Sequence, residues 1–96
     1  MAIGDIIVGL DLGVSKVSCV IGQVNKFNEI EVIGHGLANN SGIKKGQIID
    51  PSRVAKSIRE AINYAEEISE LSVNSAYVNI KGINVRIEKI VMESDV

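Results

Sequence analysis

The boundary at Asp50-Pro51 constrains this chain more than any other feature, because it marks where a helix begins. The Asp50 side chain can accept a hydrogen bond from a free N–H of the first turn, and Pro51 suits the first helical position, where its missing N–H costs nothing. Apolar residues then recur at helical spacing through about Glu70: Val54, Ile58, Ala61, Ile62 and Ala65. The sequence therefore predicts one amphipathic helix after Asp50.

Short runs rich in β-branched residues precede this helix and predict three strands. They cover Ile6–Leu10, Val17–Val24 and Ile30–Leu37, and the polar sequence NKFNE between the last two predicts a hairpin loop. Short links between strands are typical of an antiparallel meander. In the third run, Gly34 and Gly36 indicate a bulge or the close approach of another backbone.

A fourth strand, Ser75–Ile80, follows the helix after a short link. A strand that is reached through a helix favours parallel pairing with an earlier strand. We therefore expect a mixed α/β fold: an antiparallel three-strand meander, then a helix and a parallel strand. The last segment, Ile83–Val96, has the β-branched content of a strand but no obvious partner strand, so we interpret the chain as a fragment of a larger protein.

Composition and charge argue against several classes of function. The 96 residues suffice for one domain, and 46% are hydrophobic, which is typical of a globular chain. The net charge is -2 and no cluster of Lys or Arg stands out, so we expect no nucleic-acid partner. Cys19 and His35 are each the single residue of their type, which favours a small buried thiol and a structural histidine over a metal site. The sequence shows neither a signal peptide nor a membrane span.

The sequence GLDLGVSK follows the first predicted strand and places an acid, a glycine, a hydroxyl and a lysine in one turn. A phosphate site needs backbone N–H groups from a tight turn, which Gly13 permits, while Ser15 and Lys16 add a donor and a positive charge. Asp11 would repel phosphate unless a Mg²⁺ ion lies between them. The alternative is an ordinary hairpin turn, because these residue types are common there. Neither a GxxxxGK[ST] nor a complete GxGxxG motif occurs elsewhere.

The charges of the predicted helix oppose its dipole. Cations occupy the N-terminal half and anions the C-terminal half, which costs about 0.3–1 kcal/mol for each charge in a terminal turn. A solvated face with compensating neighbours explains this pattern, and a partner surface on this face is the alternative. The residues are Arg53, Lys56, Arg59, Glu66, Glu67 and Glu70.

The order of elements resembles the opening of the actin-like (ribonuclease H-like) ATPase fold, which sugar kinases and heat-shock chaperones share. Several stretches narrow the resemblance to the FtsA family of bacterial cell-division proteins: IVGLDLGVSKVSCVIGQV, IEVIGHGLANNSGIKKGQIID, the helix with AINYAEE, and SAYVNIKG. The segment GIKKGQIID is the strongest support for this resemblance, because it has no known counterpart in the chaperones and sugar kinases. The resemblance runs from about Ile6 to Gly82 and more loosely to the end.

This resemblance implies a phosphate loop. Carried over by position, the loop falls on Asp11, Gly13, Val14, Ser15 and Lys16. Asp11 would lie near Mg²⁺, through water, while Ser15, Lys16 and the backbone of Gly13 and Val14 would face the β- and γ-phosphates of ATP. A common form of the loop has Thr in place of Val14, so this chain lacks one hydroxyl. The resemblance implies no catalytic residue in this stretch.

The resemblance also implies a domain division. Residues 1–82 would form the N-terminal part of the first actin-like subdomain. Residues 83–96 would begin an inserted subdomain that contacts partners.

Full-length members of the family bind ATP with at most weak hydrolysis, polymerise as actin does, and tether filaments of the tubulin-like FtsZ to the membrane. The resemblance therefore implies FtsZ, other division proteins and further copies of the protein as partners, at the cytoplasmic face of the membrane at the division septum. The membrane contact would come from a C-terminal amphipathic helix outside this sequence. With half a nucleotide cleft, the chain alone is expected to bind ATP and Mg²⁺ weakly or not at all, to hydrolyse none, and to self-associate through unpaired strand edges.

Three alternatives stay open at this point. The first is a related pilus-assembly actin homologue. The second is a chaperone or sugar kinase on the same fold. The third is a small binding module whose polar turn contacts no nucleotide.

Overall fold

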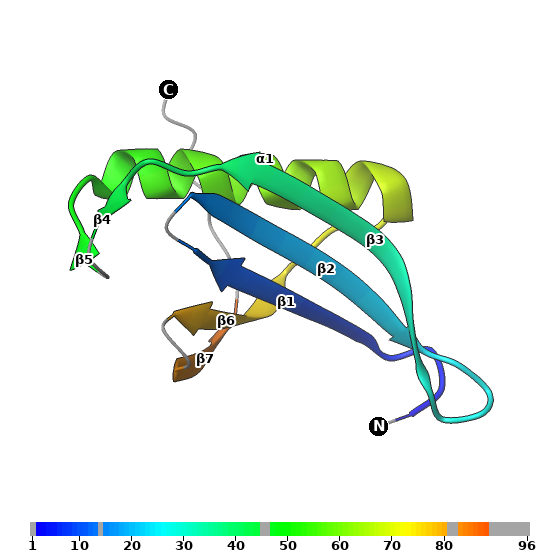
Figure 1. Cartoon of the computed structure of the whole chain (residues 1–96). Coiled ribbons are helices and arrows are strands. Elements are labelled where there is room, and N and C mark those ends of the chain that lie inside the picture. The colour runs from blue at the N-terminus through cyan, green and yellow to red at the C-terminus, as the bar shows by residue number, and fades with distance from the viewer. Residues whose placement is uncertain (1, 14, 45–46, 81–82, 89–96) are drawn as a thin grey trace.

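The computed structural model describes residues 2–13, 15–44, 47–80 and 83–88. Within them the chain forms seven strands and one helix, α1, which lies between the fifth and sixth strands in the sequence (Figure 1). The bounds are β1 Ile6–Leu12, β2 Lys16–Val24, β3 Ile30–Asn39, β4 Ile43–Lys44, β5 Gln47–Ile48, α1 Pro51–Ser69, β6 Ser75–Ile80 and β7 Ile83–Glu88.

Five of the strands form one sheet in the order β3-β2-β1-β6-β7, while β4 and β5 form a separate two-stranded sheet. β1, β2 and β3 pair antiparallel, and β6 pairs parallel to β1 after the chain has passed through α1. The predicted mixed α/β fold, a meander followed by a helix and a parallel strand, is therefore confirmed.

β7 has a partner that the sequence analysis did not find. It pairs antiparallel with β6 along its whole length, from Ile83 opposite Ile80 to Glu88 opposite Ser75. A strand at the start of this segment is confirmed, but the expectation that it lacks a partner is wrong, because β6 lies two residues upstream and forms a hairpin with it. Residues 81–82 and 89–96 lie outside the described residues, and the domain division at 82/83 stays a prediction.

Both ends of α1 carry caps that explain its bounds. The Asp50 Oδ1 atom accepts a hydrogen bond from the Arg53 N–H at 3.2 Å, and Pro51 occupies the first turn, as predicted. Glu70 ends the helix in the left-handed region with φ 61°, and its N–H donates to the Glu66 carbonyl. α1 has no acidic residue in its first turn and no basic residue in its last turn.

Some of the misplaced charges on α1 have local partners. The Arg53 guanidinium lies 3.3 Å from the Asp50 carboxylate, and the Glu66 carboxylate accepts a hydrogen bond from the Val73 N–H at 2.7 Å. These contacts compensate locally for part of the unfavourable interaction with the helix dipole. They support the interpretation of a solvated face with compensating neighbours.

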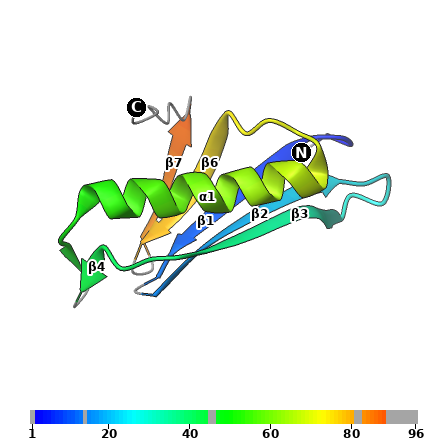
Figure 2. The same cartoon turned by 90° about the horizontal axis from the view of Figure 1, so that it is seen from above.

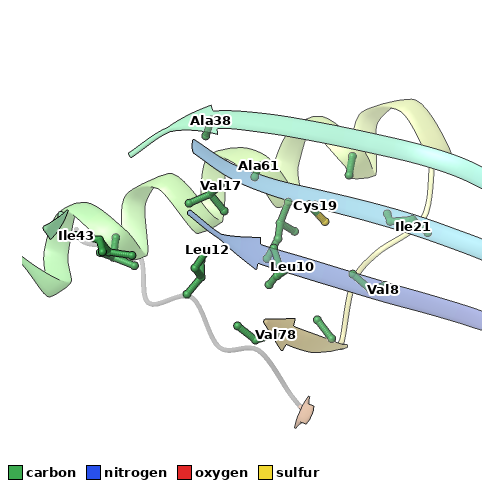
Figure 3. Close-up of a cluster of buried hydrophobic side chains, with 14 residues drawn as sticks. Val8, Leu10, Leu12, Val17, Cys19, Ile21, Ala38, Ile43, Ala61 and Val78 are labelled. Carbon is green, nitrogen blue, oxygen red and sulfur yellow. The ribbon is translucent and has the colours of Figure 1, made fainter. Parts of the chain in front are cut away.

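α1 covers one face of the sheet and packs mainly on β3 and β2 (Figure 2). Alternate residues of the strands point toward the helix and form one apolar core with it (Figure 3). Its buried members are Val8, Leu10, Leu12, Val17, Cys19, Ile21, Ala38, Ile43, Val54, Ala61, Ile62, Ala65, Ala76 and Val78.

Two glycines of β3 allow α1 to approach the sheet closely. A Cβ atom on Gly36 would lie 2.0 Å from the Ala61 carbonyl oxygen, and one on Gly34 would lie 2.6 Å from the Ala65 carbonyl oxygen. The pairing of β2 with β3 also shifts register here, with Ile33 as the extra residue beside Gly34. The sequence prediction of a bulge or a close backbone approach is confirmed on both counts.

In the described part of the chain, no helix combines the length and apolar composition that crossing a membrane requires.

We predict that Gly36→Ala destabilises the fold by about 1–3 kcal/mol or more, because the added methyl collides with backbone atoms that cannot move without displacing the helix. Chemical denaturation would measure the loss. Gly9→Ala is the matched control, since a Cβ at that strand position meets nothing within 4 Å. Equal stability of the two variants would contradict the close packing of α1 on β3.

Cys19 is completely buried in the core, as the sequence analysis predicted. Burial raises the pKa of its thiol to about 11, and the nearby negative charge of Glu66 adds to the shift. We predict that a thiol reagent at pH 8 labels the folded chain far more slowly than the denatured chain. Because the folded-state pKa is raised from 9.0, the neutral thiol favours folding below pH 9, and this contribution declines from pH 9 toward 11. Rapid labelling under native conditions would show that the core opens at Cys19.

Candidate functional site

Asp11 lies within β1 and not in the turn that the sequence analysis assigned to it. β1 continues to Leu12, two residues beyond its predicted end, because Asp11 and Leu12 pair with Ser18 and Val17 of β2 and with Asn79 and Ile80 of β6. Leu12 is buried under α1, so the alternation of the strand exposes the Asp11 side chain on the opposite face of the sheet.

The turn between β1 and β2 runs from Gly13 to Lys16. The Gly13 N–H donates to the Lys16 carbonyl at 2.9 Å, and a Cβ on Gly13 would lie only 3.0 Å from that same oxygen. Ser15 is exposed at the tip. Val14, the remaining predicted loop residue, lies outside the described residues.

Lys16 is the first residue of β2 and its side chain is exposed. Its ammonium group donates to the Asn39 side-chain oxygen at 2.5 Å, which holds the positive charge beside the turn. An ammonium group has three donors, so the contact with Asn39 leaves two for an anion. The turn therefore presents one positioned cation next to the exposed Ser15.

Asn40 was not predicted from the sequence, although it organises the turn. It is buried, its N–H donates to the Ser15 carbonyl at 2.9 Å, and its side-chain NH₂ donates to the Gly13 carbonyl at 2.9 Å. The available signal was an Asn two residues before Gly42, a spacing typical of an Asx-turn. The Gly42 N–H does donate to the Asn40 side-chain oxygen, at 3.1 Å.

Asn79 is a second residue that the sequence analysis missed. It lies opposite Asp11 in the β1–β6 pairing, and its NH₂ group lies 3.4 Å from the Asp11 carboxylate. Its Oδ1 atom is buried and has no hydrogen-bond partner in the described part of the chain. A polar residue near the end of a strand parallel to β1 was the signal that could have identified it.

Asp11 and Asn79 lie beside an open groove of about 390 Å³ on the face of the sheet opposite α1. The groove is lined by Gly9, Leu10, Asp11, Ser18, Val20, Tyr77 and Asn79.

The ends of β1, β3 and β6 and the start of β2 meet at one end of the sheet (Figure 1). This brings together four of the predicted residues, Asp11, Gly13, Ser15 and Lys16, with Asn40 and Asn79 beside them. The donor set fits a phosphate with Mg²⁺, because Asp11 and Asn79 contribute the hard oxygen atoms that Mg²⁺ prefers and Lys16 contributes positive charge. His35 is exposed on β3, and no three His, Cys, Asp or Glu side chains of the described residues group as a metal site.

Curated proteins similar to this chain include the cell division protein FtsA of Pseudomonas aeruginosa, which is 37% identical over 83 residues, covering 86% of this chain and 20% of that protein. FtsA of Borreliella burgdorferi is 36% identical over 81 residues, covering 84% of this chain and 20% of that protein. FtsA of Escherichia coli K12 is 31% identical over 77 residues, covering 80% and 18%. The chain is similar to a fragment of FtsA. It spans about a fifth of the length of these relatives, and no protein-family model matches it.

A solved structure also resembles this chain. It is the diol dehydratase-reactivating factor in nucleotide-free form, with a TM-score of 0.58 and 22% identity, covering 77% of this chain and 12% of that one. That protein has an actin-like ATPase type of fold. The likeness confirms the actin-like fold class and bears on the fold alone.

Proposed function

We propose that this chain contributes the first phosphate-binding turn of a full-length FtsA protein that acts in bacterial cell division and binds ATP with Mg²⁺. The relatives named above are cell division proteins, which supports the division role. The observation that carries the nucleotide proposal is the position of the Lys16 ammonium group, held by Asn39 beside the turn at the end of the sheet where Asp11 is exposed.

Each residue has a distinct role in this proposal. Lys16 neutralises the terminal phosphates, Ser15 donates a hydrogen bond, and the tight turn at Gly13 keeps side-chain atoms away from the anion. Asp11 holds Mg²⁺ through water, with Asn79 as the neighbouring oxygen donor. A bound Mg²⁺ ion would offset the repulsion between the Asp11 carboxylate and the phosphates.

We further propose that the full-length protein polymerises and tethers FtsZ filaments to the cytoplasmic face of the membrane at the division site. This proposal rests on the similarity of the chain to FtsA proteins. Liposomes coated with the full-length protein should recruit FtsZ filaments in a sedimentation assay. Liposomes that bind the protein but recruit no FtsZ would contradict it.

The relatives described above give no support to a pilus-assembly, chaperone, sugar-kinase or nucleotide-free binding role.

We predict that Lys16→Ala in the full-length protein weakens Mg·ATP binding by about 10- to 100-fold, since a hydrogen bond to a charged group contributes roughly 1.5–3 kcal/mol. Adenosine binding should not change, because Lys16 faces only the phosphates. Titration calorimetry would measure both affinities.

Lys26→Ala is the matched control for this experiment. Lys26 is an exposed lysine in the β2–β3 loop, at the other end of the sheet, where it lies over the Phe27 ring.

A companion variant, Asp11→Asn, should reduce the gain in ATP affinity that Mg²⁺ provides. Wild-type ATP affinity in Lys16→Ala would overturn the nucleotide proposal.

We also propose that the isolated chain self-associates through β3, which is an edge strand of the five-stranded sheet. Ile30 and Val32 on this strand are 57% and 65% exposed, and an apolar unpaired edge invites pairing with another strand. Light scattering should show a mass that rises with concentration, and Val32→Lys should reduce this rise. A monomer at every concentration would contradict the prediction.

A further inference from the structure

The chain at the end of β3 contacts the candidate phosphate turn through the buried residue Asn40, with both its backbone and its side chain. Asn40 is 6% exposed, and it makes three hydrogen bonds: its N–H to the Ser15 carbonyl, its NH₂ to the Gly13 carbonyl, and its oxygen from the Gly42 N–H. Two of these bonds reach the turn and the third secures Asn40 to its own segment. Asn40 therefore links two stretches of chain that are 27 residues apart.

The neighbouring residue, Asn39, connects the same segment to the helix. The Ser57 hydroxyl of α1 is buried and donates to the Asn39 carbonyl at 2.6 Å, while the Asn39 side chain accepts from the Lys16 ammonium group. Gly42 packs closely against the start of α1, because a Cβ on Gly42 would lie 2.6 Å from the Asp50 carbonyl oxygen. Asn40 thus projects from a segment that is itself held against the start of α1.

Carbonyl oxygens repel phosphate oxygens, so a turn that binds phosphate has to direct its carbonyls elsewhere. Asn40 attracts the carbonyls of both Gly13 and Ser15 to its own side of the turn. A turn fixed in this way before the ligand arrives avoids part of the entropic cost of ordering on binding. Removing the Asn40 side chain would leave the Gly13 carbonyl free to rotate toward the ligand.

We propose that Asn40 is a positioning residue that pre-organises the Gly13–Lys16 turn for the phosphates of a nucleoside triphosphate. This inference rests on the proposed function of the turn. In this proposal Asn40 lies outside the turn and acts through the Gly13 and Ser15 carbonyls. It sets the affinity for the phosphate part of the ligand and not for the nucleoside part.

The test compares variants of the full-length protein for ATP and adenosine binding by titration calorimetry. Asn40→Asp keeps the shape and the acceptor for Gly42, but an ionised carboxylate cannot donate to the Gly13 carbonyl. We expect ATP affinity to fall about tenfold in Asn40→Asp and Asn40→Ala, the effect of leaving the partly buried Gly13 carbonyl without its donor, with adenosine affinity unchanged. Lowering the pH should restore part of the loss in Asn40→Asp alone, since the protonated carboxyl regains a donor.

Ser41→Asp is the control for charge. It adds the same negative charge one residue later, at an exposed side chain that contacts the Arg53 guanidinium and not the turn, so ATP affinity should stay near wild type. If Ser41→Asp loses as much ATP affinity as Asn40→Asp, and Asn40→Ala loses none, the positioning role is overturned. Equal losses of ATP and adenosine affinity in the Asn40 variants would overturn it too, because they indicate a general structural effect.

Amide hydrogen exchange separates this inference from the proposed function. The N–H of residue 40 donates to the Ser15 carbonyl, so it should exchange slowly in the wild type and faster in Asn40→Ala without nucleotide. If Lys16→Ala weakens ATP binding and the Asn40 variants do not, the positioning role fails and the nucleotide site stands. If Lys16→Ala has no effect on ATP binding, the proposed function fails, and the positioning role fails with it.

Discussion

The close contact between the backbones of α1 and β3 is the constraint on which the rest of this structure depends. Gly34 and Gly36 leave room for the helix at the level of Ala61 and Ala65, where side chains on the strand would push it away. Because the backbones of α1 and β3 lie so close together, the interface between them holds small residues: Gly34, Gly36, Ala61 and Ala65. The close contact also places Ser57 within hydrogen-bond distance of Asn39, so the packing of the helix reaches the segment after β3.

That segment transmits the constraint to the β1–β2 turn. Asn39 and Asn40 together contact Lys16, Ser15 and Gly13, so the candidate site is held by hydrogen bonds from outside its own hairpin. The buried Asn40 rigidifies its surroundings, because breaking one of its bonds would leave a polar group without a partner. A turn that looks like an isolated loop in the sequence is therefore part of a network that begins at α1.

The alternation along the strands divides the sheet into two faces with different roles. The face under α1 carries the apolar core, and the opposite face carries Asp11 and Asn79 beside an open groove. The sequence predicted the helix, the meander and the parallel strand well, because caps, β-branched runs and short links are local signals. It missed the end of β1, since the pairing of Asp11 with Ser18 and Asn79 involves residues up to 68 positions away. The partner of β7 was missed although it is local, because the two-residue link between β6 and β7 was not interpreted as a hairpin turn.

The sequence by itself determined the fold class, four residues of the candidate site that the structure brings together, and the family resemblance, because each depends on residues close together in the chain. The tertiary structure decided which groups surround that turn. Asn40 and Asn79 join it through the β2–β3 and β1–β6 pairings, and nothing in their immediate sequence specifies that neighbourhood. Side chains from distant strands meet only when the register of the sheet is set, and α1 packs against the part of β3 where Gly34 and Gly36 lie.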